Sequence, residues 1–140
     1  MTLGIGGSTI EKELRSMEVI SHNVKAIAKS EYYKRIKKAT NLMKKRNVDA
    51  MFLSCSTNLR YFVNLDISVS ERLHAAIINK FGDIIYITPA FEKQKTTALI
   101  TIPGEIFTWE EDEDAAILTM TCFSHLGVSK GTIAIDENTP

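Results

Sequence analysis

The chain has 140 residues, of which 44% are hydrophobic and 24% are charged, and its formal net charge is zero. This length fits one domain that buries about two thirds of its unfolded surface, so neither disulfides nor a metal is needed to hold a core. The balanced composition excludes a disordered chain and gives no global signal for binding a polyanion. We expect a soluble globular domain.

The cysteines and the N-terminus bear on the cellular compartment. Cys55 and Cys122 lie far apart, and neither belongs to a C-x-x-C pair, which argues against a zinc site or a thioredoxin-type couple. We expect both to be small buried hydrophobes. The first residues, MTLGIGGSTIEKELRS, have no basic start followed by an apolar block, and no later apolar run approaches the ~20 residues that span a bilayer. The prediction is a cytoplasmic protein.

The first third of the chain predicts two helices. Ser8 and Glu11 have the spacing of a capping box, and apolar residues then recur at helical intervals, which predicts a helix from about residue 9 to 21. The segment EYYKRIKKATNLMKKR, after Ser30, predicts a second helix. Its apolar face is expected to contain Tyr32, Ile36, Ala39 and Met43.

The rest of the chain alternates strand and helix signals. The nearly continuous apolar run VDAMFLS predicts a strand covered on both faces. LHAAIIN and DIIYIT, separated by a turn at Gly82, predict an antiparallel hairpin whose second strand ends at Pro89. There follow a short helix at FEKQKTTAL, a strand at EIFTW, a helix over EDEDAAILTMTCFSHLG that ends at Gly127, and a last strand at TIAID. This order predicts an α/β fold, with a mixed sheet and helices on both faces.

Several patterns that could suggest a site have simpler structural explanations. The glycines of GIGGST follow no strand and lack the G-K-[ST] of a phosphate-binding loop. His22, His74 and His125 lack the spacing of histidine-ligated metal sites, and we expect His74 to be a packed or hydrogen-bonded residue. The acidic block at 110–114 suits the positive end of a helix dipole. No G-x-S-x-G elbow marks a serine nucleophile.

The helix expected after Ser30 is rich in lysine and arginine. Clustered cations of this kind bind phosphate backbones, but the same helix carries a core stripe and the acidic block offsets its charge. A solvated helix face is therefore favoured over a nucleic-acid surface. The residues concerned are Lys34, Arg35, Lys37, Lys38, Lys44, Lys45 and Arg46.

The stretch SCSTNLRYFVNL, residues 54–65, is the candidate site because it places polar side chains at the end of an expected buried strand, where ligands bind in α/β proteins. Asn58 can donate and accept hydrogen bonds, Tyr61 offers a ring and a hydroxyl, and Arg72 in the nearby SERL can fork onto a carboxylate. These groups suit a short peptide or amino acid. The alternative is structural: an Asx turn at Asn58, a core Tyr61 and Phe62, and an exposed Arg72.

Three segments resemble the N-terminal domain shared by Xaa-Pro aminopeptidases, Xaa-Pro dipeptidases (prolidases) and creatinases. They are EYYKRIKKATNLMKKRNVDAMFLSCSTNLRYFVNL, SERLHAAIINKFGDIIYITPAFE and TWEEDED. The most specific pieces are TNLRYF and ITPAFE. The resemblance covers about residues 31–140 and leaves 1–30 as an extension with one helix. Val63 and Asn64 depart from the family pattern, which often has Thr or Ser and then Gly, so the turn after TNLRYF is expected to differ.

The resemblance implies a ribonuclease H-like α/β domain that walls the active-site cleft and supports dimerisation of a peptidase cleaving next to proline. It also implies a following "pita-bread" catalytic domain, absent from this chain, whose two Asp, one His and two Glu hold two manganese or cobalt ions. This chain alone is then expected to be inactive. The resemblance places Asn58 near the substrate's amino end, with Tyr61 supporting it and Arg72 as a weaker candidate. Two alternatives stay open: a stand-alone interaction module of the same fold, and a creatinase-like amidinohydrolase parent.

Overall fold

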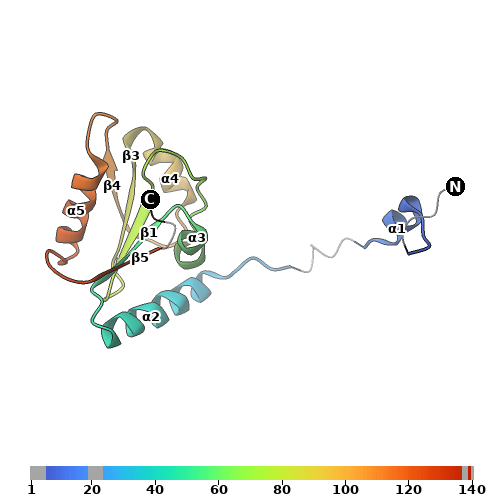
Figure 1. Cartoon of the computed structure of the whole chain (residues 1–140), viewed down its shortest axis with the longest axis horizontal. Coiled ribbons are helices and arrows are strands. Elements are labelled where there is room, and N and C mark those ends of the chain that lie inside the picture. Colours follow the sequence, from blue (N-terminus) through green and yellow to red (C-terminus); the bar gives the residue numbers. More distant parts are fainter. Residues whose placement is uncertain (1–5, 19–23, 137–138, 140) are drawn as a thin grey trace.

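A mixed sheet of five strands forms the centre of the fold in this computed structural model, which describes residues 6–18, 24–136 and 139 (Figure 1). The strand order is β4-β3-β2-β1-β5. Strand β2 is antiparallel to β1 and β3, whereas β5 is parallel to β1 and β4 is parallel to β3. The carboxyl ends of β1, β3, β4 and β5 therefore meet at one edge, here called the carboxyl edge. The strands are β1 (Ala50–Ser54), β2 (Ala75–Asn79), β3 (Ile84–Pro89), β4 (Glu105–Trp109) and β5 (Ile133–Ile135).

The three central strands have the continuous burial that their sequences predict. Every residue of β1, β2 and β3 is buried, because helices cover both faces of this part of the sheet. The expected hairpin between β2 and β3 is confirmed. Its turn is organised by Asn79, whose Oδ1 accepts the backbone N–H groups of Phe81, Gly82 and Asp83. Gly82 supplies the positive φ of 98° that this turn requires.

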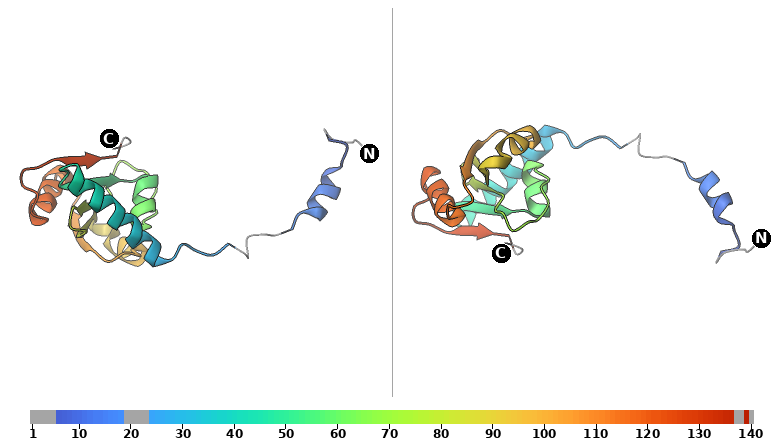
Figure 2. Two further views of the ribbon diagram at one scale, coloured as in Figure 1. Left: turned by 90° about the horizontal axis from the view of Figure 1, so that it is seen from below. Right: turned by 90° about the horizontal axis from the view of Figure 1, so that it is seen from above.

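Helices cover the two faces unequally. Helices α2 (Lys29–Lys45), α3 (Thr57–Val63) and α4 (Lys93–Leu99), the last preceded by the 3₁₀ turn η2 (Ala90–Glu92), lie on one side. Helix α5 (Ala115–His125) lies on the other side (Figures 1 and 2). The first core cluster includes Tyr32, Ile36, Met51, Leu53, Leu59, Tyr86 and Ile102, and the second includes Phe52, Ile77, Ile85, Ile87, Cys122 and Phe123. The predicted α/β fold with helices on both faces is thus confirmed.

Helix α2 forms as expected, with one difference in its buried face. Tyr32, Ile36 and Met43 are buried, but the fourth buried position is Thr40, and Ala39 is only partly buried. Thr40 tolerates this position because its hydroxyl donates to the Lys37 carbonyl within the helix.

Helix α1 (Ile10–Ser16) is shorter than the predicted 9–21, although residues 19–23 of that range lie outside the described residues. The N-cap is Thr9, whose Oγ1 accepts the N–H of Lys12, so the expected capping box at Ser8 is wrong. No residue of α1 is buried, and Figure 1 shows the helix apart from the sheet. Without tertiary packing, a helix this short has only local stabilisation.

Helix α5 begins later than the acidic run suggested. Asp114 is the N-cap, with its carboxylate accepting the N–H of Ala116, and the preceding acidic residues form a turn in which Glu113 accepts the N–H of Glu110. The C-terminal stop at Gly127, with φ of 75°, is as predicted. Among the described residues, no helix is both long and apolar enough to cross a membrane.

Residues 57–63 form α3, a helix that the expected order of elements does not contain. Ser56 caps this helix by accepting the N–H of Leu59, and Leu59 and Val63 are buried one turn apart. In the structural alternative, the Asx turn at Asn58 is wrong because the segment is helical, and the core Tyr61 is wrong because Tyr61 is 47% exposed. Phe62 does pack, partly buried, against the first core cluster. Only Cys55 and Ser56 separate the end of β1 from the start of α3, so α3 begins at the carboxyl edge.

Candidate functional site

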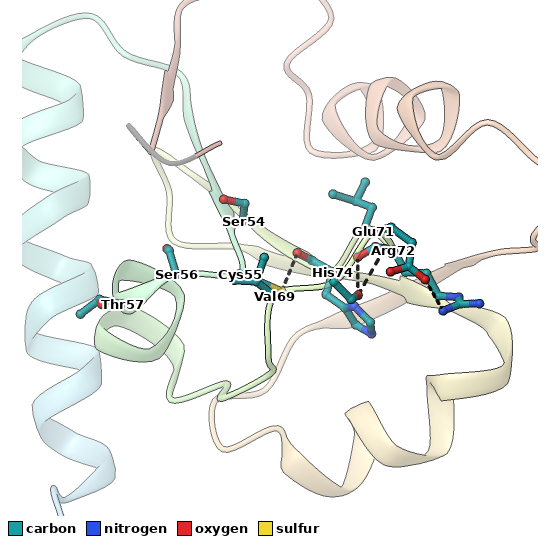
Figure 3. Close-up of a pocket in the computed structure, with 10 residues that line it drawn as sticks. Ser54, Cys55, Ser56, Thr57, Val69, Glu71, Arg72 and His74 are labelled. Carbon is teal, nitrogen blue, oxygen red and sulfur yellow. Dashed lines mark hydrogen bonds and ion pairs between the residues drawn. The ribbon is translucent and has the colours of Figure 1, made fainter. Parts of the chain in front are cut away.

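A pocket of about 460 Å³ opens at the carboxyl edge of the sheet (Figure 3). Residues 54–57, from the end of β1 to the start of α3, form one wall, and residues 69–74, which lead into β2, form the other. Ser54, Ser56 and Thr57 line the first wall, and the apolar residues Val69 and Leu73 line the second. The pocket therefore offers both polar and apolar contacts, as ligand sites in α/β proteins do at strand ends.

Of the three predicted site residues, only Arg72 lines this pocket. Its guanidinium donates from Nε and Nη2 to Glu111 Oε1, at 2.9 and 2.7 Å, and from Nη1 to Glu71 Oε1 at 2.8 Å. The same guanidinium lies 5.3 Å from the ring centroid of Phe91. The hydrogen bond from Arg72 to Glu111 is the main reason why the pKa of Arg72 is raised. Arg72 is thus a fixed cation on the rim, held by the loop after β4.

Asn58 points away from the pocket and toward the end of β5. Its Nδ2 donates to Asp136 Oδ2 at 2.8 Å, and the hydroxyl of Ser56 donates to the same oxygen at 2.5 Å. Asp136 is buried, although it lies only one residue after the exposed strand β5. These two hydrogen bonds join the first turn of α3 to the end of β5, a structural role that no local sequence pattern predicts.

Tyr61 packs against α2. The guanidinium of Arg35 lies 4.2 Å from the Tyr61 ring centroid, and Arg35 Nη1 donates to the Tyr61 carbonyl at 2.9 Å. Phe62 meets the Tyr61 ring edge-on, with centroids 5.0 Å apart. Asn58, Tyr61 and Arg72 are therefore not gathered into one pocket. Their roles toward a substrate stay predictions.

The turn after α3 keeps the backbone conformation that glycine favours, despite the departure from the family pattern. Asn64 is the C-cap and has φ of 56° and ψ of 29°, in the left-handed region. Its side chain is fixed at both ends: Oδ1 accepts from the Tyr32 hydroxyl at 2.8 Å, and Nδ2 donates to Thr101 Oγ1 at 3.0 Å. The expectation of a different turn is thus not met at Asn64, which replaces glycine's freedom with two side-chain hydrogen bonds.

Two further residues near the pocket were not proposed from the sequence as site residues. Cys55 is only partly buried, contrary to the expectation, and its thiol donates to the His74 carbonyl at 3.6 Å. Its pKa is raised, chiefly by burial. His74 is packed, as expected, with only 2% of its surface exposed. Its Nε2 lies 3.7 Å from Glu92 Oε1, a contact that no local sequence pattern indicates.

Two other features considered from the sequence are a metal site and the basic face of α2. In the described ranges, no three His, Cys, Asp or Glu side chains are arranged to hold a metal ion. The basic residues of α2 are mostly exposed, as the solvated-face interpretation predicts, except for the half-buried Arg35.

Residues 35–140 match the creatinase/prolidase N-terminal domain family. Because this match covers most of the chain, the chain belongs to that family. No curated protein matches the chain.

Solved structures of whole enzymes and of isolated domains share the fold. A dipeptidase from Pyrococcus horikoshii OT3 is 25% identical with a TM-score of 0.65, covering 76% of this chain and 29% of that chain. A prolidase from Thermococcus sibiricus is 19% identical with a TM-score of 0.70, covering 83% of this chain and 30% of that one. The creatinase/prolidase N-terminal domain of an X-Pro dipeptidase from Streptococcus pyogenes is 13% identical with a TM-score of 0.58, covering 73% and 92%. This chain spans less than a third of the first two.

Proposed function

We propose that this chain is the non-catalytic N-terminal domain of an Xaa-Pro aminopeptidase or dipeptidase, where it walls the active-site cleft and supports dimerisation. Membership of the family and the likeness to a dipeptidase and a prolidase, of which the chain covers 29% and 30%, support this proposal. The substrate of the parent enzyme would be a short peptide containing proline. The parent enzyme would act in the cytoplasm.

The observation that carries the proposal is the pocket at the carboxyl edge. It is lined by the turn between β1 and α3, by Thr57, the first residue of the TNLRYF segment that carries the most specific family resemblance, and by Arg72. Glu71 and Glu111 already hold the Arg72 guanidinium in one position. Binding a ligand there would therefore cost little additional side-chain entropy. A wall with a fixed cation and hydroxyl groups suits the polar ends of a short peptide and leaves the bond-breaking chemistry to another domain.

The chemistry would reside in that other domain. Two divalent ions, manganese or cobalt, would be bound there and supply the activated water that attacks the peptide bond. The described residues of this chain do not fit such a centre, because no three potential ligands converge. Beside its part in dimerisation, this chain would contribute binding, orientation and exclusion of longer peptides.

Kinetics of the longer protein would test this role. In a protein that carries the catalytic domain, Arg72→Ala should raise KM for an Xaa-Pro dipeptide on the order of tenfold, the loss of about 1.4 kcal/mol of binding. Arg46→Ala is the matched control, because Arg46 is an exposed arginine at the C-terminal end of α2 and does not line the pocket. Equal KM values for the two variants would contradict a cleft role for Arg72.

One observation favours a second candidate, a stand-alone interaction module. Lys34, Lys37, Lys38, Lys44 and Lys45 are all exposed on α2 and could bind an acidic partner. Such binding would weaken steeply between low and moderate salt, because exposed charges are screened over about 10 Å at 0.1 M. Partner binding that is indifferent to salt would count against it.

A creatinase-like parent would differ from an Xaa-Pro peptidase only in its catalytic half. Assays of the longer protein with an amidino compound and with an Xaa-Pro dipeptide would discriminate between these two parents.

A further inference from the structure

A buried histidine with an incompletely satisfied ring lies beside the pocket. His74 immediately precedes β2, and neither of its ring nitrogens makes a well-aligned hydrogen bond to a described residue, although the Arg72 backbone lies close to the ring. In Figure 3 its ring is directed toward α4 and away from Ser54. The nearest opposite charge is Glu92, in η2, at 3.7 Å from Nε2. This separation is within ion-pair range but longer than a hydrogen bond.

The charged and titratable groups around the ring come from η2, from α4, from the segment before β2 and from the turn after β1. Glu92 faces Nε2, and Lys95 on α4 donates to the other Glu92 oxygen at 2.7 Å. The Arg72 backbone lies close to the ring and favours its protonated form. The Cys55 thiol donates a hydrogen bond to the His74 carbonyl. Burial lowers the pKa of His74, with Lys95 acting in the same direction, whereas Glu92 and the Arg72 backbone oppose the shift. The imidazole is therefore neutral at neutral pH.

We propose that His74 and Glu92 form a proton-dependent latch between the start of β2 and the turn η2. When the imidazole takes up a proton, both ring nitrogens become donors, and a buried cation requires an acceptor. Glu92 is the carboxylate within reach. A movement of about 1 Å would turn the present contact into a charge-assisted hydrogen bond and draw η2 toward β2.

The latch has a direct route to the pocket. Glu92 directly follows Phe91 in η2. The guanidinium of Arg72 lies 5.3 Å from the centroid of the Phe91 ring. Movement of η2 would therefore shift the Phe91 ring against the Arg72 guanidinium, while Glu71 and Glu111 keep their hydrogen bonds to that guanidinium. Any effect on substrate binding rests on the proposed function, whereas the latch itself is a property of this domain.

Nuclear magnetic resonance of the whole 140-residue chain would test the latch. The imidazole signals of His74 and the backbone amides of 91–93 are followed from pH 8 to pH 5. We expect His74 to titrate below pH 6.5 and the amides of η2 to shift with the same midpoint. Glu92→Gln should lower the midpoint, because it removes the charge that favours the imidazolium. Lys95→Gln should raise it, because it removes a nearby cation.

Glu105→Gln is the matched control, because Glu105 is the carboxylate beside the exposed His125 and should leave the His74 midpoint unchanged. Three results would overturn the latch: a midpoint that neither Glu92→Gln nor Lys95→Gln moves, a titration that the amides of η2 do not follow, or an imidazole that stays neutral wherever the chain is folded. None of these readouts depends on peptidase activity. A failed latch would leave the proposed function standing, and an inactive parent protein would leave the latch standing.

Discussion

The side chain of Asn58, on the first turn of α3, is hydrogen-bonded to Asp136 just beyond β5, with Nδ2 and Oδ2 separated by 2.8 Å. Residues 78 positions apart in the sequence thus hold α3 against the exposed edge strand. Since Asp136 is buried, losing one of its donors leaves part of a carboxylate unsatisfied. This contact gives Asn58 a structural role beside its predicted role at the cleft.

Asn58→Ala should therefore lower the free energy of unfolding of this chain by about 1–2 kcal/mol. Urea denaturation would measure the change. Asn41→Ala, at an exposed position on α2, is the control and should stay within about 0.5 kcal/mol of the parent. In the longer enzyme, a loss of turnover far exceeding this loss of stability would assign Asn58 to the cleft as well. Parallel losses would confine it to the structural role.

Asn64 allows its backbone and side-chain roles to be separated. Asn64→Gly keeps the left-handed backbone but loses the hydrogen bonds to Tyr32 and Thr101, so we expect a loss of about 1–2 kcal/mol. Asn64→Ala loses the same bonds and adds backbone strain of about 1 kcal/mol or more, so it should be the less stable variant. Thermal denaturation of both proteins would check the order, and an alanine variant at least as stable as the glycine variant would contradict it.

The stability of the chain should fall as the pH drops below about 6.5. His74 has a lowered pKa in the folded state, so the unfolded chain binds more protons in this window, and protonation favours unfolding. Asp49, whose pKa is lowered by Lys80 and the Thr132 amide, contributes only at lower pH, near and below 3.8. Urea denaturation at pH 7 and pH 5 would show the loss. His74→Gln should remove most of this pH dependence, and an unchanged dependence would refute the assignment.

The two cysteines should differ in reactivity. Burial raises the pKa of Cys122 to about 11, and its side chain packs in the core beneath α5, so iodoacetamide should modify it only after unfolding. Cys55 is partly exposed but also has a raised pKa, so it should react at pH 8 more slowly than free cysteine. Mass spectrometry of the modified peptides would measure both rates. Rapid labelling of Cys122 in the folded chain would contradict the described packing.

Much of this fold is predictable from local sequence, because each element carries its own signal. The apolar runs of β1, β2 and β3 and the stripe of α2 predict their burial directly. Helix α3 is harder to predict because its polar start also suits a ligand-binding strand end or an Asx turn, although Ser56 as a cap and the spacing of Leu59 and Val63 are helical signals. The length of α1 was overestimated because its apolar spacing continues without a packing partner.

The site is harder to predict because its contacts join distant parts of the chain. The family resemblance indicates the turn after β1, but nothing near Asn58 in the sequence points to Asp136. The pairing of Arg72 with Glu111 likewise depends on β4 ending at the same edge of the sheet as β1. His74 shows no ligand spacing, so only the fold reveals Glu92 beside its ring.

If this chain works as one domain of a larger peptidase, the native protein must be much heavier than the chain, and a mass measurement would show this. An antibody raised against these 140 residues would capture the gene product from its source cells for intact mass measurement. We expect a product much heavier than the 15.7 kDa of this chain, with Xaa-Pro hydrolysis in the captured material. A captured product of 15.7 kDa without that activity would contradict the account and favour a free-standing interaction module.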